Sequence, residues 1–254
     1  MRDSTILHLN QLTHSLYQAE NRSFNATRLQ YWQGWKSCTP FFPKTDPLKI
    51  LDLGCGNGRF ARFSRENIPS TTEIEYWGID NNQELLSHAV EQTSHLEKLT
   101  SSWKKIDLVE ELVTEKLSDQ LPKNYFDLIL AFGILHHIPS QNLRGKFMAS
   151  IGEWSNTPGI CIVTFWQFGN EERFTSKQLN PSHFGIDPAE LELGDMLLPW
   201  GQNNQNARYC HASTKQEQQE LIGTINLPVL STFAADGKTE TLNQYYVLGS
   251  LATS

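Results

Sequence analysis

Hydrophobic residues in the central part of this chain occur in short runs that alternate with segments of helical spacing. Runs of strand length lie at 49–53, 73–80, 125–132 and 159–168, and helical patterns follow at 82–93 and 140–154. The runs at 125–132 and 159–168 are almost continuously apolar, as is typical of strands covered on both faces. This alternation predicts an α/β fold with a parallel sheet and helices on both faces.

The two ends of the chain have different patterns. Residues 5–37 have helical spacing, and Phe24, Arg28 and Trp32 are four residues apart, so we expect them to share one helix face. A proline-containing segment at 167–212 has little periodicity, and it precedes a predicted helix at 215–224 and predicted strands at 227–234 and 244–250. Mixed sheets often carry an antiparallel strand near an edge, and we expect these last two strands to supply it. Neither a repeat nor a linker divides the chain, which predicts a single domain over 1–254.

Composition narrows the range of partners. The 254 residues include 39% hydrophobic residues, enough for one large domain, and the formal net charge is −7, which works against chain-wide attraction to nucleic acid or an anionic membrane. The longest apolar run is too short to span a bilayer, and the start of the chain lacks the apolar stretch of a signal peptide. The four cysteines form no C-x-x-C pair. We therefore expect a cytoplasmic protein with reduced cysteines, no bound metal, and neither DNA nor a membrane as partner.

A glycine-rich segment, "ILDLGCGNG" at 50–58, follows the first predicted strand. Its G-x-G-x-G spacing at Gly54, Gly56 and Gly58 differs from the G-x-G-x-x-G of dinucleotide-binding folds. A turn of this kind can bring backbone N–H groups against a ligand, or it can be a tight turn that binds nothing. With Asp52 two positions before the first glycine, it resembles motif I of the class I S-adenosylmethionine (SAM) methyltransferases. The resemblance implies that the glycines pack against SAM and that Asp52 orders the loop and the cofactor's amino group.

Two further acidic residues fit this cofactor. Asp80 ends the second predicted strand, where a carboxylate can accept hydrogen bonds from both ribose hydroxyls, although it could instead cap the next helix. Asp107 lies where the family places an acidic contact to the adenine amino group, although it could be a solvated side chain. The resemblance implies that the remaining cofactor contacts come from Cys55, Asn57, Asn81, Leu108, Ala131 and Phe132.

The segment after the fourth predicted strand indicates which kind of group could receive the methyl group. It contains no [DN]PPY sequence, which disfavours methylation of an amide or exocyclic amine, and it holds His136 and His137. Adjacent histidines are often structural, and their side chains point to different sides. We expect His136 to be the one near the transferred methyl group.

Three other motifs carry a more specific resemblance. They are F-x-x-T-R-x-x-x-W at 24–32, "TFWQF" at 164–168, and "LPW" followed by "RYCH" within 198–211. Together they are similar to the methyltransferases that esterify 5-carboxymethyluridine at the tRNA wobble position, a domain fused to an AlkB-type dioxygenase in animals. This resemblance implies a Rossmann-like, mostly parallel seven-stranded sheet with an antiparallel C-terminal edge strand. It also implies catalytic residues Arg28, His136, Arg208 and His211, and substrate-binding residues Trp32, Trp166, Trp200 and Tyr209.

The same resemblance divides the chain and names its partners. It implies a helical cap at 1–47, a SAM-binding core at 48–166, a substrate-side insertion at 167–212 and a C-terminal helix and strand pair at 213–254. A small activator subunit is a further implied partner. The sequence departs from the family in two respects: the insertion holds more Asp and Glu than Lys and Arg, and Cys210 stands where an aromatic residue is common.

Three functions therefore remain open at this point. The chain could methylate a carboxylate of tRNA or a nucleoside, it could methylate a small carboxylic acid or hydroxyl metabolite, or it could bind SAM without catalysis. A carboxylate is already ionised at neutral pH, so its methylation needs positioning by Arg28 and Arg208 and a hydrogen bond from His136 or His211, but no general base.

Overall fold

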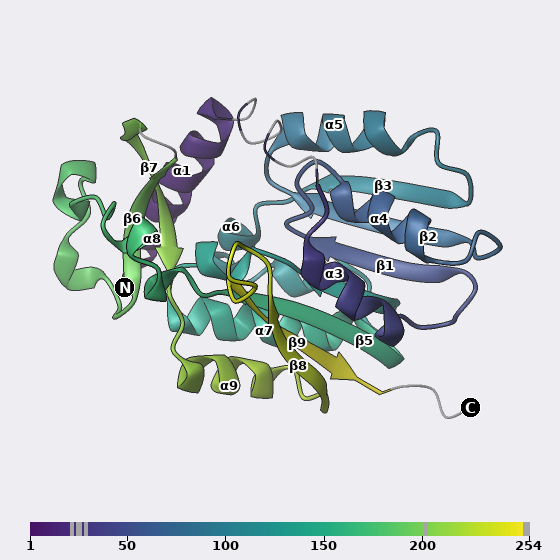
Figure 1. The fold of residues 1–254 in the computed structure, drawn as a ribbon. Helices are drawn as coiled ribbons and strands as arrows, with labels where there is room; N and C mark the ends of the chain where they lie inside the picture. Colours follow the sequence, from purple (N-terminus) through teal and green to yellow (C-terminus); the bar gives the residue numbers. More distant parts are fainter. Residues whose placement is uncertain (21–22, 24–26, 28–29, 201–202, 251–254) are drawn as a thin grey trace.

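A seven-stranded sheet forms the centre of the molecule in the computed structural model, which describes residues 1–20, 23, 27, 30–200 and 203–250. Its strands are β1 (Leu48–Leu53), β2 (Ile74–Asp80), β3 (Leu99–Lys105), β4 (Phe126–Ala131), β5 (Ser155–Trp166), β8 (Val229–Ala235) and β9 (Asn243–Gly249). The order is β3-β2-β1-β4-β5-β9-β8, with β1 to β5 parallel and β9 antiparallel to β5 and β8 (Figure 1). This confirms the predicted mostly parallel sheet, in which β8 is the outermost strand on the C-terminal side.

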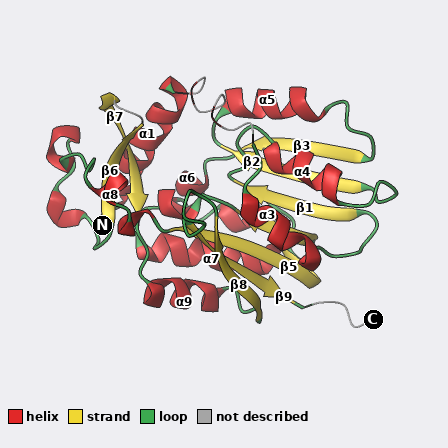
Figure 2. Cartoon of the chain, in the orientation of Figure 1, coloured by secondary structure: helices red, strands yellow, loops and turns green. Residues whose placement is uncertain are grey.

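Helices cover both faces of the sheet, as Figure 2 shows. Side chains of α3 (Gln33–Cys38) and α4 (Arg59–Asn67) pack on one face, and those of α6 (Leu108–Val113), α7 (Gln141–Trp154) and α9 (Lys215–Thr224) pack on the other. The helix α5 (Gln83–Thr93) contacts α4 and β3. Strand β4 is apolar apart from Asp127, because Leu128 and Leu130 belong to the core on the side of α3 and α4 while Ile129 and Ala131 belong to the core on the side of α6, α7 and α9.

A separate unit lies beyond the carboxyl ends of the strands. It consists of α1 (Asp3–Ala19) and an antiparallel pair of strands, β6 (Asp195–Trp200) and β7 (Asn203–His211), and α1 packs against β7 (Figure 1). The short helix α8 (Glu172–Thr175) lies in the segment that leads into the pair. The sequence analysis did not predict β6 and β7, because prolines and polar residues interrupt their alternation. No helix of the described residues is long and apolar enough to cross a membrane.

The predicted helix over 5–37 is wrong in its extent. The helix α1 ends at Ala19, and Trp32 has an extended backbone with φ −69° and ψ 139° at the N-cap of α3. Trp32 therefore cannot share one continuous helix face with the residues predicted before it. Phe24 and Arg28 lie outside the described residues.

Gly58 shows that one of the three motif glycines serves packing. It opens α4 with a left-handed φ of +74°, and a Cβ there would lie 2.8 Å from Cβ of Ala89 and 3.0 Å from the ring of Trp103. A side chain at this position would meet both an unfavourable backbone conformation and a collision with α5 and β3.

We expect Gly58→Ala to destabilise the protein by about 2–4 kcal/mol. This range is the sum of the penalty for a left-handed backbone at alanine and the penalty for overpacking. Urea unfolding measures this change. The matched control is Gly223→Ala in α9, where a Cβ would meet nothing within 4 Å. Helix propensity predicts that this control is stabilised by up to about 1 kcal/mol. Equal stability of Gly58→Ala and the wild type would contradict the packing explanation.

Candidate active site

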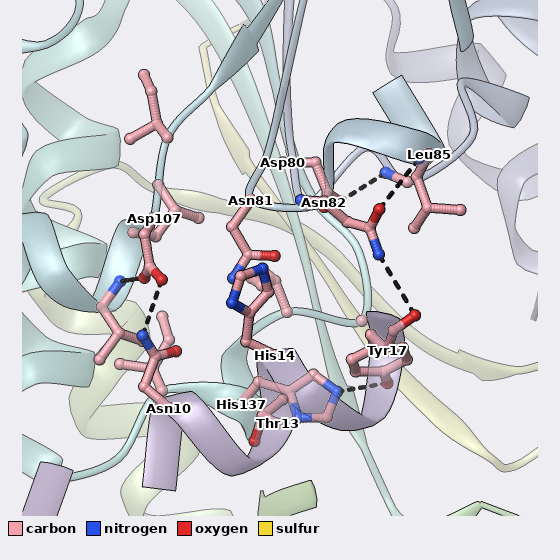
Figure 3. A pocket seen from close by; sticks show the side chains of 18 residues that line it. Asn10, Thr13, His14, Tyr17, Asp80, Asn81, Asn82, Leu85, Asp107 and His137 are labelled. Carbon is pink, nitrogen blue, oxygen red and sulfur yellow. Dashed lines mark hydrogen bonds between the residues drawn. The ribbon is translucent and has the colours of Figure 1, made fainter. Parts of the chain in front are cut away.

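Two adjoining cavities open at the carboxyl ends of the strands, where β1 lies between β2 and β4 and the direction of strand order reverses. We call the first the strand-end cavity. It is bounded by the glycine loop and by the segments that follow β2, β3 and β4, and α1 forms a further wall (Figure 3). Its polar lining residues include Asn10, Thr13, His14, Tyr17, Asp80, Asn81, Asn82, Asp107 and His137.

Asp80 connects the second strand to the glycine loop. Its Oδ2 accepts a hydrogen bond from the backbone N–H of Gly56 at 2.9 Å, and its Oδ1 accepts one from the N–H of Asn82 at 2.9 Å. Burial raises the pKa of this carboxyl group above its usual value. The N-cap of α5 is Asn82, whose side chain accepts from Glu84 and Leu85. The residue that caps α5 is therefore Asn82, and not Asp80 as the sequence also allowed.

Asp107 joins α1 to the far side of the strand-end cavity. Its Oδ1 caps α6 by accepting from the N–H groups of Val109 and Glu110, and its Oδ2 accepts from Nδ2 of Asn10 at 2.9 Å (Figure 3). The side chain is thus held in place at the cavity wall by both α6 and α1.

The second cavity, which we call the aromatic cavity, has a volume of about 770 Å³. Its lining includes the aromatic side chains of Trp32, Phe132, Trp166, Phe174 and Trp200. The described lining also includes five basic residues and one acidic residue: Arg59, Arg173, Lys177, Arg208, Lys238 and Asp236. The carboxylate of Asp236 accepts hydrogen bonds from Gly34, Asn243 and Tyr245. In a chain of net charge −7, this cavity has a locally positive lining.

Arg208 is the most buried of these cations, with 8% of its surface exposed. Its guanidinium carbon lies 5.3 Å from the ring centre of Trp166 and 5.2 Å from that of Trp200. Its Nη1 donates to the hydroxyl of Tyr17 at 2.8 Å, and its Nε is buried without a partner. No carboxylate of the described residues forms an ion pair with it. A buried charge without a counter-ion is costly, so this arrangement favours an anionic ligand.

His136 lies beside Arg208 in the aromatic cavity. It is buried, its ring centre is 4.8 Å from that of Trp166, and its Nδ1 has no hydrogen-bond partner. Burial, with the nearby His137 and Arg208, holds the pKa of His136 well below its usual value. The imidazole is therefore neutral at pH 7 and can hydrogen-bond a ligand.

The structure places most of the sequence-predicted residues on one of the two cavities. The strand-end cavity has Gly54, Gly56, Asp80, Asn81, Asp107 and Leu108 on its lining. The aromatic cavity has Trp32, Gly54, Cys55, Gly56, Asn57, Phe132, His136, Trp166, Trp200 and Arg208. The residues that line neither are Asp52, Gly58, Ala131, Tyr209 and His211. Arg28 lies outside the described residues.

His211 and Tyr209 point away from the aromatic cavity because side chains alternate along a strand. On β7 they share the face opposite Arg208. The ring nitrogens of His211 pair with Asp195 and Glu217 at 2.7 Å each, and the hydroxyl of Tyr209 donates to Asp195 at 2.6 Å. Desolvation acts to lower the pKa of His211, but its two carboxylate partners outweigh it and raise the pKa overall. These positions do not support the expected roles of His211 and Tyr209 at the acceptor, and we assign both residues to this hydrogen-bonded cluster.

Asp52 and Ala131 are core residues in this structure. Asp52 is 3% exposed and accepts a hydrogen bond from the hydroxyl of Tyr76, and burial raises its pKa to about 7. Ala131 is fully buried in the core beneath α6 and α7. Neither position supports the direct cofactor contact expected from the sequence.

Two groups of side chains bring ligand atoms within 4.8 Å of one another, as a metal site would require: His136, His137 and Cys210, and Glu192, Asp195 and His211. In each group one histidine already uses both ring nitrogens in hydrogen bonds. His137 contacts Tyr17 and the carbonyl of Tyr209, while His211 contacts Asp195 and Glu217. We therefore interpret both groups as hydrogen-bonded clusters.

Sequence reasoning missed the contribution of α1. Asn10, Thr13, His14 and Tyr17 all line the strand-end cavity, and their spacing of three and four residues places them on one helix face. That polar stripe was a detectable signal. It did not show where the helix would pack, because α1 is held by contacts with β7, about 190 residues further along the chain.

Comparisons with known proteins agree with this architecture. Residues 51–156 match a family model described as a methyltransferase domain. Over 159 residues the chain is 22% identical to an Arabidopsis thaliana protein described as tRNA (carboxymethyluridine(34)-5-O)-methyltransferase. The match covers 63% of this chain but only 33% of that relative, so the chain corresponds to about a third of the relative's length.

Solved structures with the same fold include a SAM-dependent methyltransferase from Methanosarcina mazei, with a TM-score of 0.62 and 14% identity, covering 89% of this chain and 100% of that one. A second belongs to the complex between the Trm112 methyltransferase activator of Haloferax volcanii and a methyltransferase. It has a TM-score of 0.61 and 13% identity, and covers 95% of this chain and 99% of that one. Residues 51–156 therefore match a methyltransferase domain, and the chain has the Rossmann-like fold of SAM-dependent methyltransferases.

Proposed function

We propose that this enzyme transfers the methyl group of SAM to a carboxylate on a tRNA wobble uridine or a related nucleoside, forming a methyl ester. The observation that carries the proposal is the guanidinium of Arg208, buried beside the glycine loop with no carboxylate partner among the described residues. The activity named for the Arabidopsis relative, esterification of a carboxymethyluridine, supports the same chemistry.

In this proposal the strand-end cavity holds SAM. The remaining lone pairs of the Asp80 carboxylate accept the two ribose hydroxyls, Asp107 contacts the adenine amino group, and Gly54 and Gly56 allow the cofactor to approach the backbone. The two cavities share Tyr17, Gly54, Gly56 and Gly133 on their linings. The methyl group would reach the acceptor across this shared boundary.

The acceptor chemistry suits the groups in the aromatic cavity. A carboxylate with a pKa near 4 needs no base, and its charge is neutralised as the sulfonium gives up the methyl group. Arg208 would hold the carboxylate within about 3–3.5 Å of the methyl carbon, and neutral His136 would hydrogen-bond it. The arginine should orient the acceptor without binding it so tightly that the ground state is stabilised more than the transition state.

The rest of the aromatic cavity supports a nucleotide acceptor. Indole and phenyl rings stack on exposed bases, and Trp32, Trp166 and Trp200 offer such surfaces. Arg173, Lys177 and Lys238 are exposed on the lining and could contact flanking phosphates. A small carboxylic acid is the second candidate, favoured by the net charge of −7. A small activator subunit is a further proposed partner, supported by the complex reported for the Haloferax methyltransferase.

For the cofactor, we expect Asp80→Ala to weaken SAM binding by about 1.5–3 kcal/mol, the loss expected when hydrogen bonds to a charged group are removed. Isothermal titration calorimetry of SAM binding measures the change. Asp119→Ala, in the loop before β4 and on neither cavity, is the control and should bind SAM as the wild type does. Unchanged affinity in Asp80→Ala would refute the ribose assignment.

For the acceptor, we expect the wild type to transfer label from SAM to an anticodon stem-loop RNA that carries 5-carboxymethyluridine. We expect Arg208→Lys to lower kcat/KM for this RNA by about 10- to 100-fold, because lysine keeps the charge but loses the planar fork that orients a carboxylate. SAM affinity should stay nearly unchanged.

Arg65→Lys is the matched control, since Arg65 donates to backbone carbonyls of Ile68 and Thr72 and lines neither cavity. Label that enters only the small-molecule fraction of a cell extract, with none in this RNA, would favour the small carboxylic acid. Full activity in Arg208→Lys would contradict the proposed role of the arginine for either acceptor.

A further inference from the structure

Tyr17 stands at the boundary between the two cavities. Of the four described residues that line both, three are glycines, so Tyr17 supplies the side chain at this boundary. It lies in the last turn of α1, and its backbone carbonyl accepts from Nδ2 of Asn82 at 3.4 Å (Figure 3). No motif in the sequence analysis includes it.

The hydroxyl of Tyr17 has a defined direction of hydrogen bonding. Nδ1 of His137 lies 2.8 Å from the carbonyl oxygen of Tyr209, which can only accept, so Nδ1 carries the hydrogen. Burial lowers the pKa of His137 to about 3, so the ring is neutral and its Nε2 is an acceptor. Nε2 lies 2.9 Å from the Tyr17 hydroxyl, which must therefore donate to it (Figure 3). The Tyr17 oxygen accepts in turn from Nη1 of Arg208 at 2.8 Å.

This arrangement favours one edge of the Arg208 guanidinium for a ligand. The rings of Trp166 and Trp200 lie within 5.3 Å of the guanidinium carbon, and Tyr17 takes one of the two hydrogens of Nη1. Nε has no partner, and no hydrogen bond from Nη2 joins it to a described residue. The Nε and Nη2 hydrogens form a parallel pair that matches the two oxygens of a carboxylate.

The attachment of α1 to the strand pair does not depend on the Tyr17 hydroxyl alone. Thr13, one turn earlier on α1, already accepts a hydrogen bond from the backbone N–H of Tyr209 at 3.0 Å. Leu9 packs with Tyr209 and Leu197 in a small core between α1 and the strands. Thr13 and Leu9 therefore hold α1 on the strand pair in addition to the link from Tyr17 to Arg208.

We infer that Tyr17 is a positioning residue: by holding Nη1 of Arg208, it fixes the guanidinium so that the unpaired Nε–Nη2 edge binds the acceptor carboxylate. This inference rests on the proposed function, in which Arg208 binds that carboxylate. Tyr17 also lines the strand-end cavity. The side chain that orients Arg208 therefore lies at the boundary between the two cavities, across which the proposed methyl transfer takes place.

The test is a double-mutant cycle with Tyr17→Phe and Arg208→Lys, using saturating SAM and the 5-carboxymethyluridine stem-loop RNA. Tyr17→Phe keeps the ring and should lower kcat/KM by about tenfold, the scale of one hydrogen bond to a charged group. In the Arg208→Lys background the same change should have little further effect, because Tyr17 acts through the arginine. SAM affinity and the urea midpoint should stay close to those of the wild type.

Tyr125→Phe is the matched control, because it removes a hydroxyl that donates to Glu75 at the opposite ends of the strands. This control should have wild-type kcat/KM. Equal losses from Tyr17→Phe in both backgrounds, or no loss in either, would overturn the inference.

A second measurement separates this inference from the proposed function. The Nη1 resonance of Arg208 in nitrogen-15 NMR should shift in Tyr17→Phe and not in Tyr125→Phe, whatever the acceptor is. If the wild type fails to methylate the RNA but the resonance shifts, the proposed function fails and the positioning by Tyr17 stands. An unchanged resonance would overturn the positioning role.

Discussion

The candidate site depends on one constraint: the guanidinium of Arg208 is buried, and the described residues provide no carboxylate to pair with it. Arg144 on α7 provides a useful contrast. Arg144 is 1% exposed and pairs with Glu192 at 2.8 Å and Glu217 at 2.7 Å, so this fold does supply carboxylates to a buried arginine. Around Arg208 it supplies a tyrosine hydroxyl and indole rings. Uncompensated burial of a charge costs free energy that an anionic acceptor would recover on binding. Arg144 thus forms a structural ion pair, whereas the proposed function makes Arg208 part of a binding site.

The two arginines also act together in the fold. The ion pairs of Arg144 join α7 to α9 and to the segment before β6, and His211, Asp195 and Tyr209 extend this cluster along β6 and β7. It occupies the face of β7 opposite Arg208. Fixing one face of a strand fixes the direction of the side chains on the other, because the alternation leaves no freedom to rotate. The cluster thus holds Arg208 toward the aromatic cavity, while the parallel sheet independently places the glycine loop, Asp80 and Asp107 around the strand-end cavity.

The sheet and most of the cofactor side could be predicted from the sequence because their signals are local. An apolar run such as 125–132 predicts a strand covered on both faces, and the glycine spacing with Asp80 and Asp107 marks the strand ends. On the acceptor side, the resemblance identifies His136, Trp166 and Arg208, which line the aromatic cavity, but it does not indicate α1, whose packing against β7 joins segments that lie far apart in the chain. The resemblance assigns Arg208, Tyr209 and His211 of the "RYCH" segment to one site, but as part of a strand the segment has two faces. Arg208 reaches the aromatic cavity, while Tyr209 and His211 turn away from it. Tyr17 belongs to no motif, and its role follows only from the packing of α1.

The central claim is that the acceptor is already an anion, so that catalysis needs orientation and no proton-abstracting base. The pH dependence of kcat at saturating SAM tests it most directly. Burial lowers the pKa of His136 well below its usual value and that of His137 to about 3, so both rings are neutral at neutral and alkaline pH. A carboxylate acceptor is ionised over the same range. We therefore expect kcat to stay level from about pH 6 to pH 9. A tenfold rise per pH unit across this range would reveal a base that must first lose its proton, as a hydroxyl acceptor requires, and would contradict the account.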